Sequence, residues 1–352
     1  MSALPDKRPP ISSLNDREAA ADDSKPSKSL MNAFIAQYPG LADVETLITS
    51  SLGSDAKMLT EIGCYLQKLG GKRIRPLLTL VAARLCGMPS PSAQLVTAAS
   101  GIELIHMATL LHDDIIDESP TRRSQESAYR RYGLPATLLA GDFLLVKAFG
   151  LCATLDRFVI TSTERACIEL TEGELLEGHM TAESGFALEQ YLDVIRKKTA
   201  SLFHLSCSVG AHIAGAEESR VAAMGMFGEQ AGIAFQMIDD ILDVVADEDL
   251  LGKPVGTDLR QKTPSLVNLI WLNSFPEEAK KFFSIPEPSA EDCRLAVEWL
   301  RNSSVISEAR AMARQWADDA KASLKTAATG ASDTSPATQL EWLLEYTLNR
   351  CL

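Results

Sequence analysis

The chain has 352 residues, of which 46% are hydrophobic and 23% charged, and its formal net charge is −13 at pH 7. This composition is typical of a globular protein that can bury a large core. The negative charge argues against a nucleic-acid partner, which would favour a basic face. No uninterrupted apolar run approaches the ~20 residues that span a bilayer, so we expect no transmembrane helix.

Residues 1–30 are expected to form a disordered tail, because they are rich in Pro, Ser and Asp and contain no apolar stretch. This segment lacks the apolar core of a signal peptide, and its acidic residues argue against a mitochondrial presequence. The seven scattered cysteines form no CxxC pair, a pattern typical of buried thiols in a reducing compartment. We therefore expect a cytoplasmic protein.

From residue 31 onward apolar residues recur at helical intervals, and convincing two-residue alternation is absent. Clusters of Pro and Gly separate the periodic stretches and indicate loops. The expected helices span residues 74–87, 92–118, 136–155, 160–181, 187–215, 218–246, 262–274, 290–301, 304–327 and 337–350. Nothing between them resembles a linker, so the sequence predicts one all-α domain over residues 31–352.

Two of these helices carry clusters of aspartates in otherwise apolar runs. The clusters are Asp113, Asp114 and Asp117 in LLHDDIIDES, and Asp239, Asp240 and Asp243 in QMIDDILDVV. Residues four apart share a helix face, so Asp113 points with Asp117, and the two carboxylates repel by ~4 kcal/mol if ~4 Å apart at an effective dielectric of 20. A solvated acidic face is the simpler interpretation of such a cluster. Apolar residues flank both clusters, however, and divalent cations held between facing helices would explain the carboxylates.

Four basic segments could bind an anionic ligand held by such a metal site. They contain Lys72, Arg73 and Arg75; Arg122 and Arg123; Lys197, Lys198 and Thr199; and Lys253, Arg260 and Lys262. Each segment alone is better explained as a solvated basic patch. Two of them directly follow the aspartate clusters, however, and Arg and Lys are the side chains that bind phosphate.

Together these segments resemble the trans-isoprenyl (E-polyprenyl) diphosphate synthase family. The resemblance runs from about Leu69 to Leu272, with a weaker similarity in LEWLLEYTLNR, and rests on GGKRIRP, ELIHxxxLLHDDxxDxxxxRR, AGD, GE, KTA, FQxxDDxxD and GKPxGxDL. It implies an isoprenoid-synthase helical bundle around a deep central cavity, usually in a homodimer. In such a bundle two aspartate-rich helices face each other, and about three Mg²⁺ ions hold the diphosphate of an allylic substrate.

The resemblance also implies a role for each matching residue. The metal ligands would be Asp113, Asp117 and Asp239, with Asp114, Asp240 and Asp243 nearby. The catalytic residues at the allylic diphosphate would be Lys198, Thr199, Gln236 and Lys253, with Arg122 and Lys262 as further diphosphate contacts. The isopentenyl diphosphate pocket would contain Lys72, Arg75, His106 and Arg123.

The implied reaction is head-to-tail addition of isopentenyl diphosphate to an allylic diphosphate. Metal and basic groups stabilise the departing diphosphate, and a dry cavity protects the cation-like allylic carbon. Short-chain members carry large aromatics four and five positions before the first Asp, where this chain has Thr109 and Ala108. One turn deeper lie Ile105 and Gly101. The resemblance therefore implies a product of about C20 or longer.

Three positions depart from the family pattern. Ser124 stands where Gly usually follows the two arginines, Glu177 stands where Gln is common in long-chain members, and residues 260–264 lack the Gly expected before Lys262. A class I terpene cyclase is one alternative, although GGKRIRP and the second intact DDILD weigh against it. A catalytically weak subunit of a heteromeric prenyl synthase is the other, although such a subunit would be expected to lose aspartates or arginines.

Overall fold

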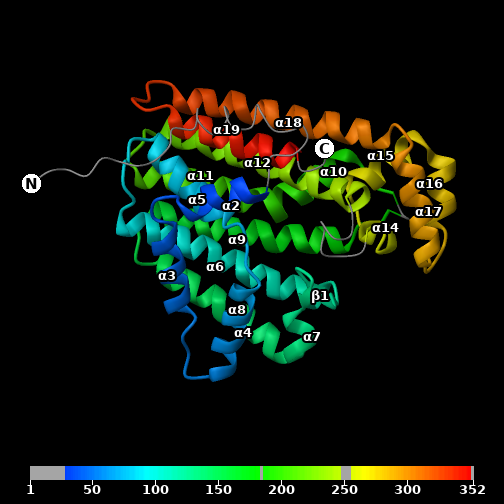
Figure 1. Cartoon of the computed structure of the whole chain (residues 1–352), viewed down its shortest axis with the longest axis horizontal. Helices are drawn as coiled ribbons and strands as arrows, with labels where there is room; N and C mark the ends of the chain where they lie inside the picture. The colour runs from blue at the N-terminus through cyan, green and yellow to red at the C-terminus, as the bar shows by residue number, and fades with distance from the viewer. Residues whose placement is uncertain (1–27, 183–184, 247–254, 350–352) are drawn as a thin grey trace, which may run out of the picture.

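The structure is a computed structural model that describes residues 28–182, 185–246 and 255–349. In these residues it is helical except for one two-stranded antiparallel hairpin, which confirms the all-α prediction (Figure 1). The N-terminal half comprises α2 (Lys28–Ala36), α3 (Leu41–Ser51), α4 (Lys57–Lys68), α5 (Ile74–Leu85), α6 (Ala93–Ile116), β1 (Thr121–Arg122), β2 (Gln125–Glu126), α7 (Ala128–Tyr132), α8 (Leu134–Cys152) and α9 (Arg157–Gly178). The C-terminal half comprises α10 (Leu188–Ile195), the π-helical η1 (Arg196–Ala200), α11 (Ser201–Ile213), α12 (Glu218–Val245), α14 (Thr257–Arg260), α15 (Leu266–Ser274), α16 (Pro276–Phe283), α17 (Ala290–Arg301), α18 (Val305–Ala328) and α19 (Ser335–Leu348).

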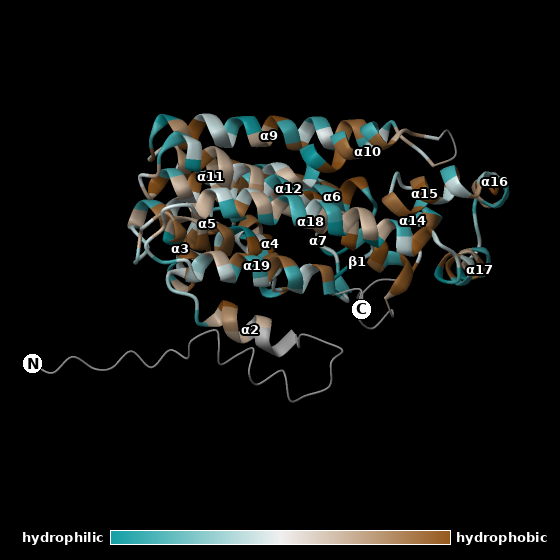
Figure 2. Cartoon of the chain, turned by 90° about the horizontal axis from the view of Figure 1, so that it is seen from above, coloured by the Kyte–Doolittle hydropathy of each residue, from teal (hydrophilic) through white to brown (hydrophobic). Residues whose placement is uncertain are grey.

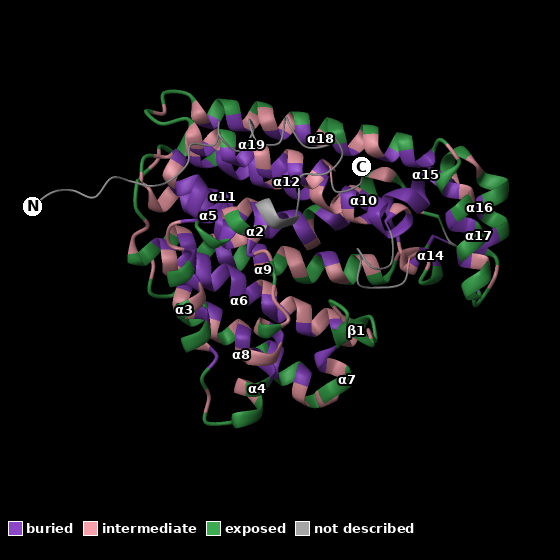
Figure 3. Cartoon of the chain, in the orientation of Figure 1, coloured by how far each residue is buried: buried purple, intermediate pink, exposed green. Residues whose placement is uncertain are grey.

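The core of the bundle is built on α12, which packs against α11 and α18. Helix α11 also packs against α5, and α6 packs against α8. Figure 3 shows α5, α11 and α12 largely buried, whereas α16 and α17 at one end carry exposed faces. Burial of apolar side chains on several faces of these helices explains why their sequences are apolar nearly all round.

Close helix packing depends on glycine at particular crossings. A Cβ on Gly210 of α11 would lie 2.3 Å from the carbonyl oxygen of Thr79 in α5. A Cβ on Gly228 of α12 would lie 2.4 Å from the carbonyl oxygen of Phe203 in α11. Since neither distance is compatible with a side chain, the two glycines set how closely the three central helices approach.

The long predicted helices are confirmed, with differences at their ends. Helix α6 ends at Ile116 instead of residue 118, because Glu118 has a φ of 48°, which does not continue an α-helix. The predicted helix 187–215 is divided by η1, where the Ser201 N–H bonds to the Arg196 carbonyl five residues earlier. The prediction missed the helices α2, α3, α4, α7, α14 and α16 and the β1–β2 hairpin.

The predicted tail, residues 1–30, lies outside the described residues except for its last three, which begin α2. Two described helices, α6 and α8, are long and apolar enough to cross a membrane by length and composition alone. The apolar stretch of α6 is 67% buried, as in a core helix of a folded domain, whereas that of α8 is 28% buried. The expected absence of a transmembrane helix therefore stays a prediction.

Candidate active site

The first aspartate cluster occupies the last turn of α6. Asp113 is half-buried, Asp117 is exposed and Asp114 is fully buried. The Asp114 carboxylate accepts a hydrogen bond from Arg122 Nε at 2.6 Å, so its negative charge is partly satisfied within the protein. Asp113 and Asp117 are more accessible to an external ligand than Asp114 is.

The β1–β2 hairpin presents the two arginines that follow this cluster. Arg122 lies in β1, and the turn consists of Arg123 and Ser124, whose φ angles are 53° and 62°. The hairpin is fixed to the end of α6 by Ser127, whose Oγ donates to the Ser119 carbonyl at 2.6 Å and whose N–H donates to the Pro120 carbonyl. The usual Gly is replaced by Ser124 at a left-handed position, where a side chain costs roughly 1–2 kcal/mol.

The second aspartate cluster lies in the last two turns of α12. Asp240 accepts hydrogen bonds from the Tyr191 hydroxyl at 2.8 Å, the Leu266 N–H at 2.8 Å and Gln236 Nε2 at 3.0 Å. Burial raises the pKa of Asp240 to about 6, against the effect of these donors. Asp243 is 1% exposed and accepts from the Asp258 N–H at 2.9 Å. Asp239 is half-buried, so it is the member of this cluster with the most access to a ligand.

One aspartate of each cluster acts on the same cation, the Arg75 guanidinium. Burial lowers the pKa of Arg75, whereas the charges of Glu103, Asp113 and Asp239 act in the opposite direction. Arg75 also stacks over the Phe203 ring, with 5.2 Å from its Cζ to the ring centroid. Because Asp113 and Asp239 both act on Arg75, one aspartate from α6 and one from α12 lie near the same cation, and their role as metal ligands stays a prediction.

Burial raises the pKa of Asp113 to about 7, and the nearby Glu174 and Asp117 add to this effect against the charges of Lys198 and Arg122. A cation between the clusters would relieve this repulsion. Within the described part of the chain no three His, Cys, Asp or Glu side chains are grouped to hold an ion by themselves. Carboxylate oxygens are suitable ligands for a hard divalent ion. When the protein supplies only a few of them, the remaining coordination positions of the ion can be filled by the oxygens of a phosphate ligand. The residues present therefore fit such an ion.

A chain of hydrogen bonds joins the predicted allylic residues to the second cluster. The Thr199 hydroxyl donates to Gln236 Oε1 at 2.8 Å, and Gln236 Nε2 donates to Asp240. Lys198, in the same π-helical segment as Thr199, pairs with Glu174 and Glu177 of α9. Three predicted residues, Lys198, Thr199 and Gln236, are thus brought to the same end of the bundle.

The GGKRIRP segment enters α5 beside the arginine hairpin. Gly71 is close to both Arg73 and Arg123, since a Cβ on Gly71 would lie 3.2 Å from a guanidinium nitrogen of each. Lys72 Nζ donates to the Tyr346 hydroxyl of α19 at 3.2 Å and lies 4.8 Å from the centroid of that ring. Burial, followed by the charges of Arg75, Arg123, Arg122 and Arg73, holds the pKa of His106 well below its usual value. His106 therefore lies near these cations. Arg75 and Arg123 therefore act on a neutral His106, and these three residues and Lys72 make up the predicted isopentenyl pocket.

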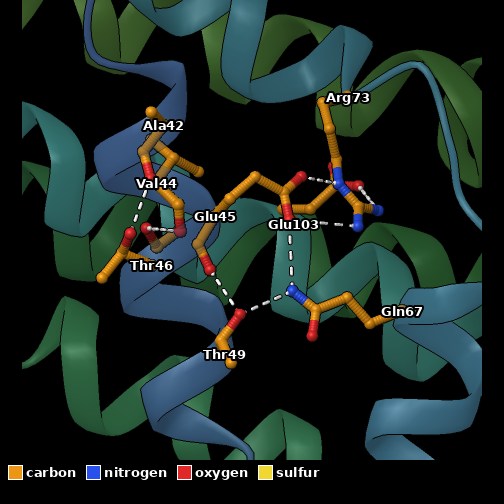
Figure 4. Close-up of polar contacts among 9 residues, drawn as sticks. Ala42, Val44, Glu45, Thr46, Thr49, Gln67, Arg73 and Glu103 are labelled. Carbon is orange, nitrogen blue, oxygen red and sulfur yellow. Dashed lines mark hydrogen bonds and ion pairs between the residues drawn. The ribbon is translucent and has the colours of Figure 1, made fainter.

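The Arg73 side chain makes a buried ion-pair network beneath this pocket (Figure 4). Its Nη1 lies 3.0 Å from Glu103 Oε1, its Nε pairs with Glu45, and the two carboxylates raise its pKa although burial acts against them. Gln67 Nε2 then donates to Glu45 at 3.1 Å. Arg73 itself has a φ of 48°. The network fixes the turn between Lys72 and Arg75, the two residues predicted to bind isopentenyl diphosphate.

The described structure does not bring two of the predicted residues to the site. Lys253 falls outside the described residues. Lys262 donates from Nζ to the Phe283 carbonyl at 2.9 Å, so its ammonium contacts α16, and its predicted diphosphate contact stays a prediction.

The sequence reasoning gave no role to several residues that the structure places at the site. These are Glu45, Glu103, Glu174, Tyr191 and Tyr346. Glu103 and Glu174 stand in segments that resemble family motifs, ELIH and GE, and Tyr346 stands in the weaker C-terminal similarity LEWLLEYTLNR. Tyr191 contacts the site through a partner distant in sequence and carries no local pattern.

Comparison with known proteins agrees with this geometry. A family model described as polyprenyl synthetase matches residues 56–302. The chain is 34% identical over 319 residues to a geranylgeranyl diphosphate synthase of Sulfolobus acidocaldarius, covering 87% of this chain and 95% of that protein. It is 37% identical over 252 residues to an octaprenyl diphosphate synthase of Escherichia coli, covering 71% and 77%.

The fold is similar to that of a polyprenyl synthase from Caulobacter crescentus solved in complex with calcium and isoprenyl diphosphate. The TM-score is 0.84 at 32% sequence identity, and the match covers 94% of this chain and all of that one. The helical bundle is therefore of the isoprenoid synthase type.

Proposed function

The chain belongs to the polyprenyl synthetase family, and from this premise we propose that it adds isopentenyl diphosphate head-to-tail to an allylic diphosphate and releases diphosphate. The observation that carries the proposal is the position of Asp113 and Asp239. They lie on different helices and both act on the charge of Arg75, and the charges of Lys198 and Arg122 act on Asp113. A bundle with only a structural role would leave both acidic clusters unexplained.

The residues of the chain divide between two substrates. Asp113, Asp117 and Asp239 would hold a divalent metal, which when bound neutralises charge on the departing diphosphate. Lys198 and Arg122 would contact the allylic diphosphate, and the carbonyl oxygen of Gln236, bonded by Thr199, is suited to stabilise a nearby cationic carbon. Lys72, Arg75 and Arg123 would hold isopentenyl diphosphate, with His106 neutral beside it.

The metal we propose is Mg²⁺, with about three ions per site, because carboxylates that supply few ligands leave positions for phosphate oxygens. The Caulobacter relative contains calcium with isoprenyl diphosphate, which supports a hard divalent ion in this fold. A product of about C20 or longer is consistent with the relatives, which include geranylgeranyl, octaprenyl and nonaprenyl diphosphate synthases.

We further propose a homodimer formed through α8 and α9. These adjoining helices expose large apolar side chains, among them Leu139 (59% exposed), Val146 (68%) and Leu175 (65%). Figure 2 shows α9 at the edge of the molecule with apolar turns among polar ones. Leu139→Glu together with Val146→Glu should convert a dimer to a monomer in size-exclusion chromatography with light scattering. A wild-type monomer that floats with lipid vesicles would instead indicate a membrane surface, against the proposed cytoplasmic location.

The function is tested by incubating the purified chain with labelled isopentenyl diphosphate, Mg²⁺ and each allylic starter in turn, and sizing the products. The proposal requires products longer than the starter by multiples of five carbons. If the allylic substrate alone is consumed and cyclised, the chain is a terpene cyclase. If no starter is used, the chain is a catalytically weak subunit of a heteromeric synthase.

A further inference from the structure

We propose that Glu177 is a positioning residue that, together with Glu174, fixes the Lys198 ammonium toward the allylic diphosphate. The inference deepens the proposed function and rests on the role of Lys198 in that site.

The geometry shows one ammonium held by two carboxylates. Glu174 and Glu177 are three residues apart on α9 and therefore share a helix face. Lys198 Nζ lies 2.8 Å from Glu174 Oε2 and makes a still closer pair with Glu177 Oε2. The three side chains are 23–26% exposed, so solvent competes little for these contacts.

The neighbouring lysine provides an internal contrast. Lys197 pairs with Glu172 at 3.3 Å and with Asp193 at 3.2 Å, but these two carboxylates are 53% and 44% exposed. Surface pairs of this kind contribute little to fixing a side chain. Of these two lysines, Lys198 is the one whose carboxylate partners are shielded, and its charge acts on Asp113.

Two features of the backbone bring this ammonium to α9. Gly173 lets η1 approach, because a Cβ on it would lie 2.7 Å from the Lys198 backbone nitrogen. The π-helical turn Arg196–Ala200 then directs successive side chains differently from an α-helix, and such turns are frequent at functional sites. The Lys198 position is therefore built by two elements of the fold, α9 and η1.

Charge balance explains what the second carboxylate adds. Burial alone would lower the pKa of Lys198, but Glu177 and Glu174 raise it above the ordinary value, so the amine stays protonated. An ammonium has three N–H donors. Two carboxylates occupy two of them and leave one in a fixed direction for a diphosphate oxygen. With one carboxylate removed, the ammonium can rotate away from the position where charge develops in the transition state.

Glu177→Gln tests this role with minimal change in shape. The wild-type enzyme is assayed first, and its Mg²⁺-dependent elongation establishes the proposed function independently. We expect the variant to lower kcat about tenfold, because the ammonium is less fixed in the transition state. We also expect it to lower KM for the allylic diphosphate about threefold, since a negative charge near an anionic substrate is lost.

Glu172→Gln is the matched control, because it removes a carboxylate of the same helix, and this carboxylate pairs with Lys197 instead of Lys198. The kcat and KM of this variant should remain at wild-type values. Far-UV circular dichroism and the Mg²⁺ concentration for half-maximal activity are measured for both variants. An unchanged kcat for Glu177→Gln overturns the inference while leaving the function intact. A many-fold rise in the Mg²⁺ requirement also overturns it, because Glu177 would then be a metal ligand.

Discussion

Loss of one partner of the buried ion pair Arg73–Glu103 should destabilise the protein by several kcal/mol. Replacement of both partners by apolar residues should cost little. Glu103 is 3% exposed, Arg73 is 8% exposed, and their charged atoms lie 3.0 Å apart. Removal of one partner of a buried pair leaves an uncompensated charge at a cost of about 3–5 kcal/mol. We therefore expect Arg73→Met to lower the free energy of unfolding by about 3–5 kcal/mol.

Glu103→Leu should cost less than this, because Arg73 keeps its second partner, Glu45. The double variant Arg73→Met/Glu103→Leu should recover much of the loss, with an interaction energy of about 2–3 kcal/mol. The measurement is urea unfolding followed by circular dichroism for both single variants and the double variant. Glu45→Gln is the control, since Glu45 is 37% exposed and its loss leaves the Arg73–Glu103 contact intact.

The Arg73→Met defect should depend on pH in a defined direction. Burial raises the pKa of Glu103 above the ordinary value of 4.5, and loss of Arg73 removes the larger of the two charges, Arg73 and Arg75, that oppose this rise. The folded state then binds more protons than the unfolded state above pH 4.5, so its stability falls as pH rises. The defect should be smaller at pH 5 than at pH 8. A loss below about 1 kcal/mol, or a loss independent of pH, would refute the buried-pair reasoning.

Three smaller predictions concern single contacts. Ala108→Phe should shorten the product. Because Ala108 is fully buried, Thr109→Phe provides a second test at a half-buried position. An unchanged product distribution in both variants would contradict the assignment of these residues as the chain-length floor. Ser124→Gly should raise the free energy of unfolding by about 1 kcal/mol in urea titration by relieving a φ of 62°, whereas Ser124→Ala should not. Tyr346→Phe removes a hydrogen bond to Lys72 and should raise KM for isopentenyl diphosphate about 2–10-fold with kcat unchanged; a wild-type KM would exclude α19 from the pocket.

The sequence was sufficient for the long helices, because apolar periodicity sustained over 12 to 28 residues is a strong signal. It was insufficient for α3, α7 and α14, whose 11, 5 and 4 residues offer too few turns to reveal a period. Length does not explain why α4 was missed, because its 12 residues equal those of α17, which was predicted. The break at η1 was also missed, since its π-helical hydrogen bonding leaves the apolar spacing on both sides unchanged.

The same distinction holds in the site. The spacing of Asp113 and Asp117 indicated that they share a face, and the structure leaves both accessible while Asp114 turns inward to Arg122. The partners of Asp240 were beyond local reasoning, because Tyr191 and Leu266 are 49 and 26 residues away in the chain. Similarly, the Glu177–Lys198 pair joins two helices whose approach depends on Gly173.

The central claim is that α6 and α12 hold one diphosphate jointly through divalent metal. Calorimetric titration of inorganic diphosphate, with and without Mg²⁺, tests it most directly in the wild type, Asp113→Ala and Asp239→Ala. We predict that binding requires Mg²⁺ and that either substitution alone weakens it by orders of magnitude with helix content intact, because both aspartates serve the same cluster. Metal-independent binding, or wild-type affinity in either variant, would contradict the claim.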